Sequence, residues 1–332
     1  MTSIHIEDCS KIEIHIHVIG YFPKGESILV ILWDDNDSTV LKSILIDSYQ
    51  VDGDNKFEAL LKHCSIDSSK LDYFIWTHPD LDHSLGIPEI IKNYTNKKTR
   101  YLVPVGLTSK VFKSMKSALF RSWLSIIKRP RYSVSPISTS ILYSSAPNIC
   151  QYYEDGINDN VKFSLEIVAP LSEVSFNETE KKTTPYKNDI SIAFNIVLGN
   201  LRFFFGGDIT NTTIKKIPKE GFSNTIFVKI PHHGSDTSNE LPNKYITNED
   251  DDTLDERYPI IAVSTMFEDH PTHLPQNDVL DLYKNLASHI LLTNKLDPKC
   301  NYGIWSIKYK LNSIKALNDP KPEGDANIYF NS

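Results

Sequence analysis

Hydrophobic and polar residues alternate along residues 11–19, where Ile12, Ile14, Ile16 and Val18 fall on one face. Successive side chains of a strand point to opposite faces of a sheet, so this alternation predicts a half-buried β-strand. Short apolar runs bounded by polar or Gly/Pro-containing turns predict further strands. These lie at residues 27–33, 40–46, 71–77, 100–103, 161–168, 190–198, 201–205, 225–230, 260–264, 289–293 and 303–310.

Helices are expected between these strands, at residues 57–63, 87–94, 110–127, 210–217 and 278–286. Many strands with intermittent helices, and polar clusters at strand ends, are typical of an α/β sandwich of two mixed β-sheets flanked by helices. We expect a single domain over residues 1–315 with a basic insertion around 95–150. Residues 316–332, rich in Pro, Asp and Asn, are expected to form a loose tail.

The composition is that of an ordinary globular protein, with 332 residues, 40% hydrophobic and 23% charged. The four cysteines, Cys9, Cys64, Cys150 and Cys300, form no Cys-x-x-Cys pair, which favours a reducing compartment. The chain has no basic start followed by an apolar run and no stretch of about 18 apolar residues. We therefore expect a cytoplasmic protein with no membrane partner.

Charge is distributed unevenly along the chain. The formal net charge is −7, yet residues 90–153 contain eleven Lys and Arg residues and no Asp or Glu, so the rest carries (35 − 11) − 42 = −18. Such a segment favours a surface for a polyanion or an acidic partner. The candidate substrate contacts in it are Lys110, Lys113, Arg121, Lys128, Arg129 and Arg131.

Aromatic residues are interleaved with these cations, a mixture that suits single-stranded nucleic acid. The alternative is a solvated helix face whose Phe112, Phe120 and Trp123 belong to the core. For the aromatic residues alone we favour the core interpretation. For the absence of acidic residues we favour a binding surface.

Four candidate metal ligands, His78, Asp80, Asp82 and His83, lie within six residues directly after the predicted strand 71–77. Imidazoles and carboxylates are the groups that divalent metals bind, and two ions about 3.5–4 Å apart form the usual clamp for hydrolytic displacement. The alternative is an exposed acidic loop with two incidental histidines. We disfavour it because two further clusters follow other strands.

The second cluster is Asp208, which follows the apolar strand 201–205 and two glycines. A buried carboxylate there is costly unless it is paired, and a position between two cations would satisfy it. The third cluster, His232-His233-Gly234-Ser235, follows the strand 225–230. Adjacent side chains point in opposite directions after a strand, so one histidine can bind metal while the other faces substrate.

The order of these motifs resembles the metallo-β-lactamase superfamily, and more narrowly its ComEC-like branch, named for the hydrolase domain of the competence DNA-uptake protein. That branch has a His-x-Asp-x-Asp-His loop, an Asn-x-x-Ser strand, a Gly-Asp strand end and a His-His-Gly-Ser loop. This chain has them at residues 78–83, 188–191, 207–208 and 232–235, and the similarity extends over residues 12–310. The resemblance implies the metallo-β-lactamase αββα sandwich.

Two divalent ions are implied by the resemblance, held by His78 and Asp80 on one side, by Asp82, His83 and His233 on the other, and by Asp208 between them. It also gives Asp82 and His232 roles in catalysis, with His232 orienting substrate or stabilising the transition state. Asp47, at the end of the strand 40–46, would support the ligands from behind.

The chain departs from the broad superfamily at two places. Asp80 stands where a histidine is usual, and no histidine occurs between His83 and His232. The first metal position is therefore oxygen-rich, aided by Asn188 or water, so Mn²⁺ competes there with Zn²⁺, the metal expected first. The late motif of the family, Asn-x-Tyr-x-His-Pro, is distorted in this chain at residues 269–275. Spacing favours His273 as an additional ligand or substrate contact, whereas the His-Pro dipeptide favours His270.

We expect a metal-dependent hydrolase that uses a metal-bound hydroxide, a phosphodiesterase or nuclease acting on nucleic acid. Lactamase, glyoxalase or thioesterase activity is disfavoured, because such enzymes usually keep the histidines missing here. One alternative is a hydrolase of a small phosphodiester, a nucleotide or another ester. The other is an accessory protein that docks an acidic partner through the basic segment 92–131.

Overall fold

The computed structural model describes residues 11–36, 38–50, 56–63, 71–105, 107, 116–130, 133–137, 150–158, 161–171, 187–246, 260–269, 271–294, 299–311, 313 and 315–331. No helix in these ranges is long and apolar enough to cross a membrane.

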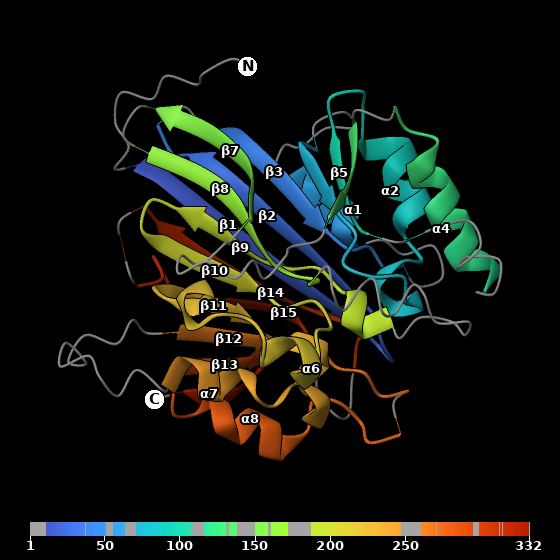
Figure 1. Cartoon of the computed structure of the whole chain (residues 1–332). Helices are drawn as coiled ribbons and strands as arrows, with labels where there is room; N and C mark the ends of the chain where they lie inside the picture. The colour runs from blue at the N-terminus through green and yellow to red at the C-terminus, as the bar shows by residue number, and fades with distance from the viewer. Residues whose placement is uncertain are drawn as a thin grey trace.

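Two eight-stranded sheets form the centre of the molecule (Figure 1). The first has the order β15-β14-β1-β2-β3-β4-β5-β6, antiparallel from β15 to β3 and parallel from β3 to β6. Its strands are β15 (Lys321–Gly324), β14 (Tyr302–Lys310), β1 (Ile12–Tyr21), β2 (Glu26–Asp34), β3 (Thr39–Ile46), β4 (Tyr73–Ile75), β5 (Arg100–Pro104) and β6 (Val134–Ile137).

The second sheet has the order β16-β13-β12-β11-β10-β9-β8-β7. Its middle, from β13 to β10, is parallel, and both flanks are antiparallel. Its strands are β16 (Asn327–Asn331), β13 (Ala287–Leu292), β12 (Ile260–Ser264), β11 (Thr225–Lys229), β10 (Leu201–Phe205), β9 (Ala193–Leu198), β8 (Val161–Ala169) and β7 (Cys150–Asn158).

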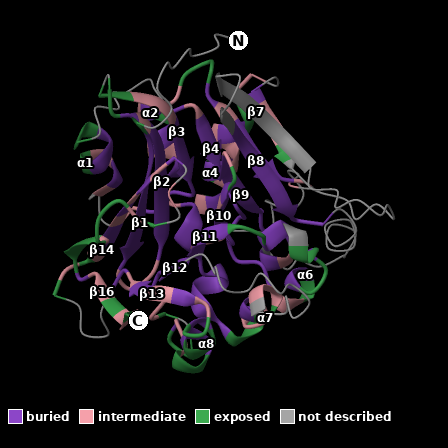
Figure 2. Cartoon of the chain, turned by 90° about the vertical axis from the view of Figure 1, so that its left-hand side faces the viewer, coloured by how far each residue is buried: buried purple, intermediate pink, exposed green. Residues whose placement is uncertain are grey.

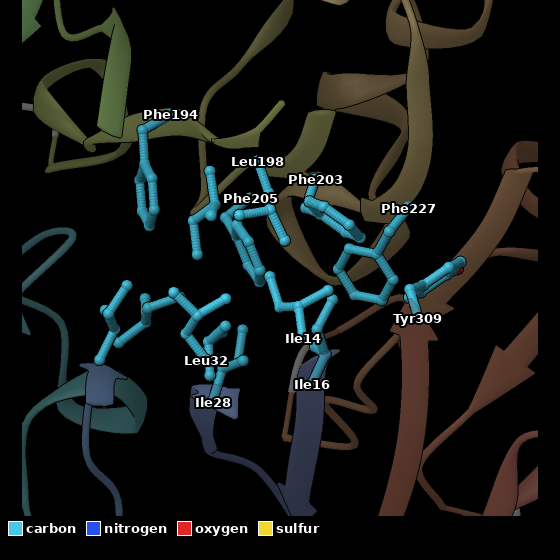
Figure 3. Packing of buried hydrophobic residues seen from close by; sticks show 14 of the residues in the cluster. Ile14, Ile16, Ile28, Leu32, Phe194, Leu198, Phe203, Phe205, Phe227 and Tyr309 are labelled. Carbon is cyan, nitrogen blue, oxygen red and sulfur yellow. The ribbon is translucent and has the colours of Figure 1, made fainter. Parts of the chain in front are cut away.

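The main hydrophobic core lies between the sheets (Figure 3). Ile14 and Ile16 of β1 point into it from the first sheet and meet Phe203 and Phe227 of the second. Ile19, further along β1, faces outward and packs in a different cluster. The predicted alternation therefore separates two cores, because consecutive side chains of the strand enter opposite layers.

Helices cover the outer face of each sheet (Figures 1 and 2). Buried residues of α1 (Lys56–His63), α2 (Ile87–Tyr94) and α4 (Ser117–Ile127) pack with the first sheet. Buried residues of α6 (Asn211–Ile214), α7 (Leu241–Ile246) and α8 (Asn277–Tyr283) pack with the second. These layers confirm the predicted αββα sandwich of two mixed β-sheets.

Two parts of the chain differ from the predicted organisation. The expectation of a loose tail over residues 316–332 is wrong, because β15 pairs with β14 and β16 pairs with β13. Edge strands tolerate proline and exposed polar residues, which explains the misleading composition of this segment. The basic region around 95–150 also supplies β5 and β6 of the first sheet and α4 above it.

Candidate metal centre

The three predicted clusters meet at one edge of the sandwich. Each follows the carboxyl end of a strand: the 78–83 loop follows β4, Asp208 follows β10, and the His232–His233 pair follows β11. The loops are joined by backbone bonds across the seam between the sheets, where the Ile192 N–H donates to the Thr77 carbonyl at 2.8 Å. Residues that are far apart in the sequence thereby share one small volume.

The closest group consists of four buried residues whose ligand atoms all lie within 4.8 Å of one another: Asp82, His83, Asp208 and His233. Oδ2 of Asp82 lies 3.3 Å from Nε2 of His83 and 3.2 Å from Nε2 of His233. Asp208 places Oδ1 3.5 Å from Nε2 of His83 and Oδ2 3.7 Å from Nε2 of His233. This set is the one predicted for the second ion together with the bridging carboxylate.

His78 joins the group through Asp208, since its Nε2 lies 3.6 Å from Oδ2 of that carboxylate. Asp80 is half-exposed at the margin of the cluster. Its Oδ1 accepts from the Leu81 N–H at 2.7 Å and thereby caps the short 3-10 turn Leu81–His83. The structure thus brings His78 to the shared carboxylate, while Asp80 supports the turn that carries Asp82 and His83.

Three buried atoms of the cluster have no hydrogen-bond partner in the described part of the chain: Nε2 of His78, Nε2 of His83 and Oδ1 of Asp208. Leaving a buried polar atom unpaired costs about 1–3 kcal/mol, so such atoms in a folded protein usually bind an ion, a ligand or water. All three belong to metal-ligand side chains that converge on each other. The donor set therefore fits divalent metal ions.

The charge balance of the site points the same way. Four carboxylates are buried around the cluster: Glu26, Asp47, Asp82 and Asp208. One buried ammonium, Lys229, offsets a single charge, so neutral imidazoles leave a net charge of 1 − 4 = −3. Burial alone would lower the pKa of His83, but the carboxylates of Asp208, Asp82 and Asp47 raise it well above its usual value. The site attracts positive charge, which bound cations would supply.

Asp47 fixes the orientation of two histidines from behind. Nδ1 of His83 donates to Oδ2 of Asp47 at 2.8 Å, which leaves the Nε2 lone pair facing the cluster. The Thr77 hydroxyl donates to the same Oδ2 at 2.6 Å, so it accepts from Nδ1 of His78 at 3.0 Å. Both rings thus direct Nε2 at the site, and in its neutral form each ring offers that nitrogen as a metal ligand. Metal-binding histidines are held in this way by carboxylates that lie behind them.

His233 is oriented by a separate chain of contacts. Its Nδ1 lies 2.7 Å from the Thr265 hydroxyl, which donates to Oε2 of Glu26 at 2.6 Å. Lys229 donates to the same Oε2 at 2.8 Å. Glu26, Thr265 and Lys229 were missed in the sequence. In the sequence, these positions stand out only because Lys229 and Glu26 are charged residues at the ends of mainly apolar strands.

Backbone strain accumulates at the same edge. Asp47, His232 and His233 adopt φ of 55°, 49° and 52°, in the left-handed region that non-glycine residues rarely enter. Residues in such conformations cost about 1–3 kcal/mol each and cluster at functional sites. Gly207 has φ of 50°, and a Cβ there would meet the Ser191 Oγ at 2.5 Å. Close packing around Asp208 therefore requires glycine.

His232 is hydrogen-bonded to residues outside the four-residue group. The side-chain amide of Asn188 donates to its Nε2 at 2.9 Å, and its Nδ1 donates to the Thr237 hydroxyl at 2.7 Å. Asn188 therefore contacts His232 in this structure. The neighbouring His233 points into the cluster, where its Nε2 lies 3.2 Å from Oδ2 of Asp82.

His273 is not brought to the cluster. Its side chain is 65% exposed, and Nδ1 lies 2.9 Å from Oε2 of Glu268. His270, the other candidate from the late motif, lies outside the described residues.

The predicted substrate patch is described in part. Arg121 and Lys128 are exposed on α4 and Arg129 is half-buried, whereas Lys110, Lys113 and Arg131 lie outside the described residues. Helix α4 contacts the end of the 78–83 loop, because the Ser122 hydroxyl donates to the carbonyl of Ser84 at 2.9 Å. Its aromatic residues Phe120 and Trp123 pack against the core. The described patch residues therefore lie on or directly after a helix that is anchored to the residue following His83.

No protein-family model and no curated protein sequence matches the chain. Solved structures that match it are metallo-β-lactamase-fold proteins. YhfI from Bacillus subtilis shares 11% identity at a TM-score of 0.40, over 89% of this chain and 100% of that chain. A variant of the metallo-β-lactamase from Cronobacter sakazakii shares 12% identity at a TM-score of 0.33, over 57% of this chain and only 61% of that chain. Likeness of this degree concerns the fold and carries no functional argument.

Proposed function

We propose that the chain is a dinuclear metal-dependent hydrolase of the ComEC-like branch of the metallo-β-lactamase superfamily that cleaves phosphodiester bonds, with nucleic acid as the leading substrate. The observation that carries this proposal is the convergence of Asp82, His83, Asp208 and His233, with unpartnered buried atoms on His83 and Asp208. Imidazoles and carboxylates such as these bind the divalent ions of hydrolytic sites.

One ion would be held by Asp82, His83 and His233, and the other by His78 and Asp80, with Asp208 shared. The chemistry that such ions supply when bound is activation of water and neutralisation of charge on the phosphoryl oxygens. We propose Zn²⁺ for the nitrogen-rich position and Mn²⁺ as its competitor at the oxygen-rich one.

The protein's own contribution to the reaction is orientation and proton transfer. Hydrogen bonds from Nδ1 hold His78 and His83 with their Nε2 atoms toward the carboxylates of the cluster. His232, 9% exposed, accepts at Nε2 from Asn188. A substrate that displaces the amide would meet an imidazole able to hold a proton at Nε2 and return it to the leaving oxygen.

A phosphodiester substrate is supported by exposed basic residues on and directly after α4. Arg121 and Lys128 are exposed on α4, which is anchored to the residue after His83 through Ser122. Contacts to phosphates from such residues supply affinity without sequence readout. Because Phe120 and Trp123 are packed against the core, we propose binding by charge rather than by base stacking on these rings.

The activity test compares the wild type with Asp208→Ala on single-stranded DNA, RNA, cyclic nucleotides and a chromogenic phosphodiester, each with Mn²⁺ or Zn²⁺. We expect the wild type to cut at least one substrate and the variant none. If the wild type cuts nothing with either metal, the hydrolase proposal fails. Cleavage of the small diesters alone would refute nucleic acid as the leading substrate.

The binding test measures affinity for a single-stranded oligonucleotide in rising salt. Arg121→Glu and Lys128→Glu together should weaken binding and reduce the salt slope by about 0.7 for each lost phosphate contact. Lys321→Glu, an exposed charge change on β15, is the matched control and should bind as the wild type does. Binding that does not depend on salt would argue against recognition of a polyanion.

A further inference from the structure

We propose that the buried Glu26–Lys229 ion pair, acting through the Thr265 hydroxyl, is a positioning device that sets His233 in its metal-binding orientation. This inference rests on the proposed function in one respect: it takes the cluster to be a metal centre. It assigns roles to three residues that lie behind the ligands and do not touch a bound substrate.

The ion pair joins the two sheets at the metal edge. Glu26 is the first residue of β2 in the first sheet, and Lys229 is the last residue of β11 in the second. Their side chains are 1% and 0% exposed, and Nζ lies 2.8 Å from Oε2. Thr265 directly follows β12, the neighbour of β11. The pair therefore links β2 of the first sheet to β11, the strand that leads into His233.

The direction of each hydrogen bond follows from the groups present. A carboxylate can only accept, so Oε2 of Glu26 accepts one hydrogen bond from Lys229 and another from the Thr265 hydroxyl. That hydroxyl has no second hydrogen to offer. It must accept from Nδ1 of His233, 2.7 Å away. The ring is thereby held with Nδ1 protonated and Nε2 directed at Asp82 and Asp208.

Lys229 has a reason to be buried at this point. Two carboxylates, Glu26 and Asp47, lie together behind His83, with Oε1 of Glu26 3.7 Å and Oδ2 of Asp47 2.8 Å from its Nδ1. Without a cation on Glu26, these like charges would compete for the same imidazole. The ammonium holds Glu26 toward Thr265 and leaves Asp47 to orient His83. Glu26 then serves His233, and Asp47 serves His83 and, through Thr77, His78.

The test removes the hydroxyl while keeping the shape of its side chain. Thr265→Val should bind Co²⁺ about 10- to 100-fold more weakly than the wild type, with an altered visible spectrum of the bound ion. Thr265→Ser restores the hydroxyl and should restore both affinity and spectrum. Thr213→Val, at another buried threonine in α6, is the matched control and should behave as the wild type does.

Thermal unfolding of the metal-free proteins shows whether each variant folds, and Glu26→Gln removes the charge of the ion pair while keeping an acceptor for the Thr265 hydroxyl. Equal Co²⁺ affinity and spectra in the wild type, Thr265→Val and Glu26→Gln would overturn the positioning role while leaving the proposed function intact. A wild type that binds no Co²⁺, Zn²⁺ or Mn²⁺ would overturn the metal centre itself. Weakening in Thr265→Val without recovery in Thr265→Ser would also overturn the hydroxyl relay.

Discussion

Replacing Lys229 with methionine removes a buried ammonium while keeping an unbranched side chain of similar length. The change leaves Glu26 as a carboxylate that is 1% exposed and has lost its ammonium partner. Among the described residues, its remaining ion-pair contacts are with the imidazoles of His83 and His233, each 3.7 Å away. Burial opposes ionisation of this group, but Lys229 first, and then His83 and His233, lower the pKa of Glu26 to about 2. Loss of the ammonium removes the largest of these favourable contributions.

The expected size of the effect follows from the burial of both partners. Removing one member of a buried ion pair costs about 3–5 kcal/mol, because the other charge stays in a dry environment. The Thr265 hydroxyl still donates to Glu26, so we expect the lower end, about 3 kcal/mol. An unfolding entropy of about 2.1 cal/mol/K per residue gives about 0.7 kcal/mol/K for this chain. The melting temperature should therefore fall by about 4 °C.

The assay is calorimetric unfolding of metal-free protein in chelator at neutral pH, since bound metal would stabilise the folded state. Glu26→Gln combined with Lys229→Met is the decisive companion, because it removes both charges and keeps an acceptor for Thr265. It should recover at least half of the lost stability. A fall of less than 1 °C in Lys229→Met, or a double variant as unstable as the single one, would refute the reasoning.

Three further predictions concern pH, catalysis and packing. Despite burial, the Lys229 ammonium holds the pKa of folded Glu26 at about 2. The stability that ionised Glu26 contributes is therefore present above the usual carboxyl range and is lost as pH falls toward 2. In acid titrations of the metal-free proteins, Glu26→Gln should lose stability less steeply than the wild type. His232→Ala should lower turnover and leave the metal content unchanged. Loss of bound metal in this variant would instead identify His232 as a ligand. Gly207→Ala, with φ of 50° and a Cβ 2.5 Å from the Ser191 Oγ, should lower the free energy of unfolding by roughly 1–3 kcal/mol in denaturant titrations.

The fold and the ligand cluster were accessible from the sequence because both depend on local patterns. Alternating residues in β1 mark a strand with two different faces, and His78, Asp82 and His83 stand directly after an apolar run. Asp208 and the His232–His233 pair follow β10 and β11, adjacent parallel strands whose carboxyl ends meet at one edge of the second sheet. That they lie beside the 78–83 loop of the first sheet was implied by the family resemblance alone.

The supporting residues could not be found in this way, because their role arises from contacts across the two sheets. Glu26 and Lys229 are about two hundred positions apart, and neither stands in a motif. The terminal strands were missed for a related reason: β15 and β16 lie at sheet edges, where polar residues and proline are tolerated and apolar alternation is weak. The late motif offered His273 and His270: His273 lies at the surface beside Glu268, and His270 lies outside the described residues.

The central claim is that the cluster at this edge is a dinuclear metal centre. Metal analysis after dialysis against Zn²⁺ or Mn²⁺, followed by removal of free ions, tests it most directly. The account predicts two ions bound per wild-type chain and at most one in Asp208→Ala, since that carboxylate is shared between the two positions. A wild type that retains no divalent metal, or a variant that retains as much as the wild type, would contradict it.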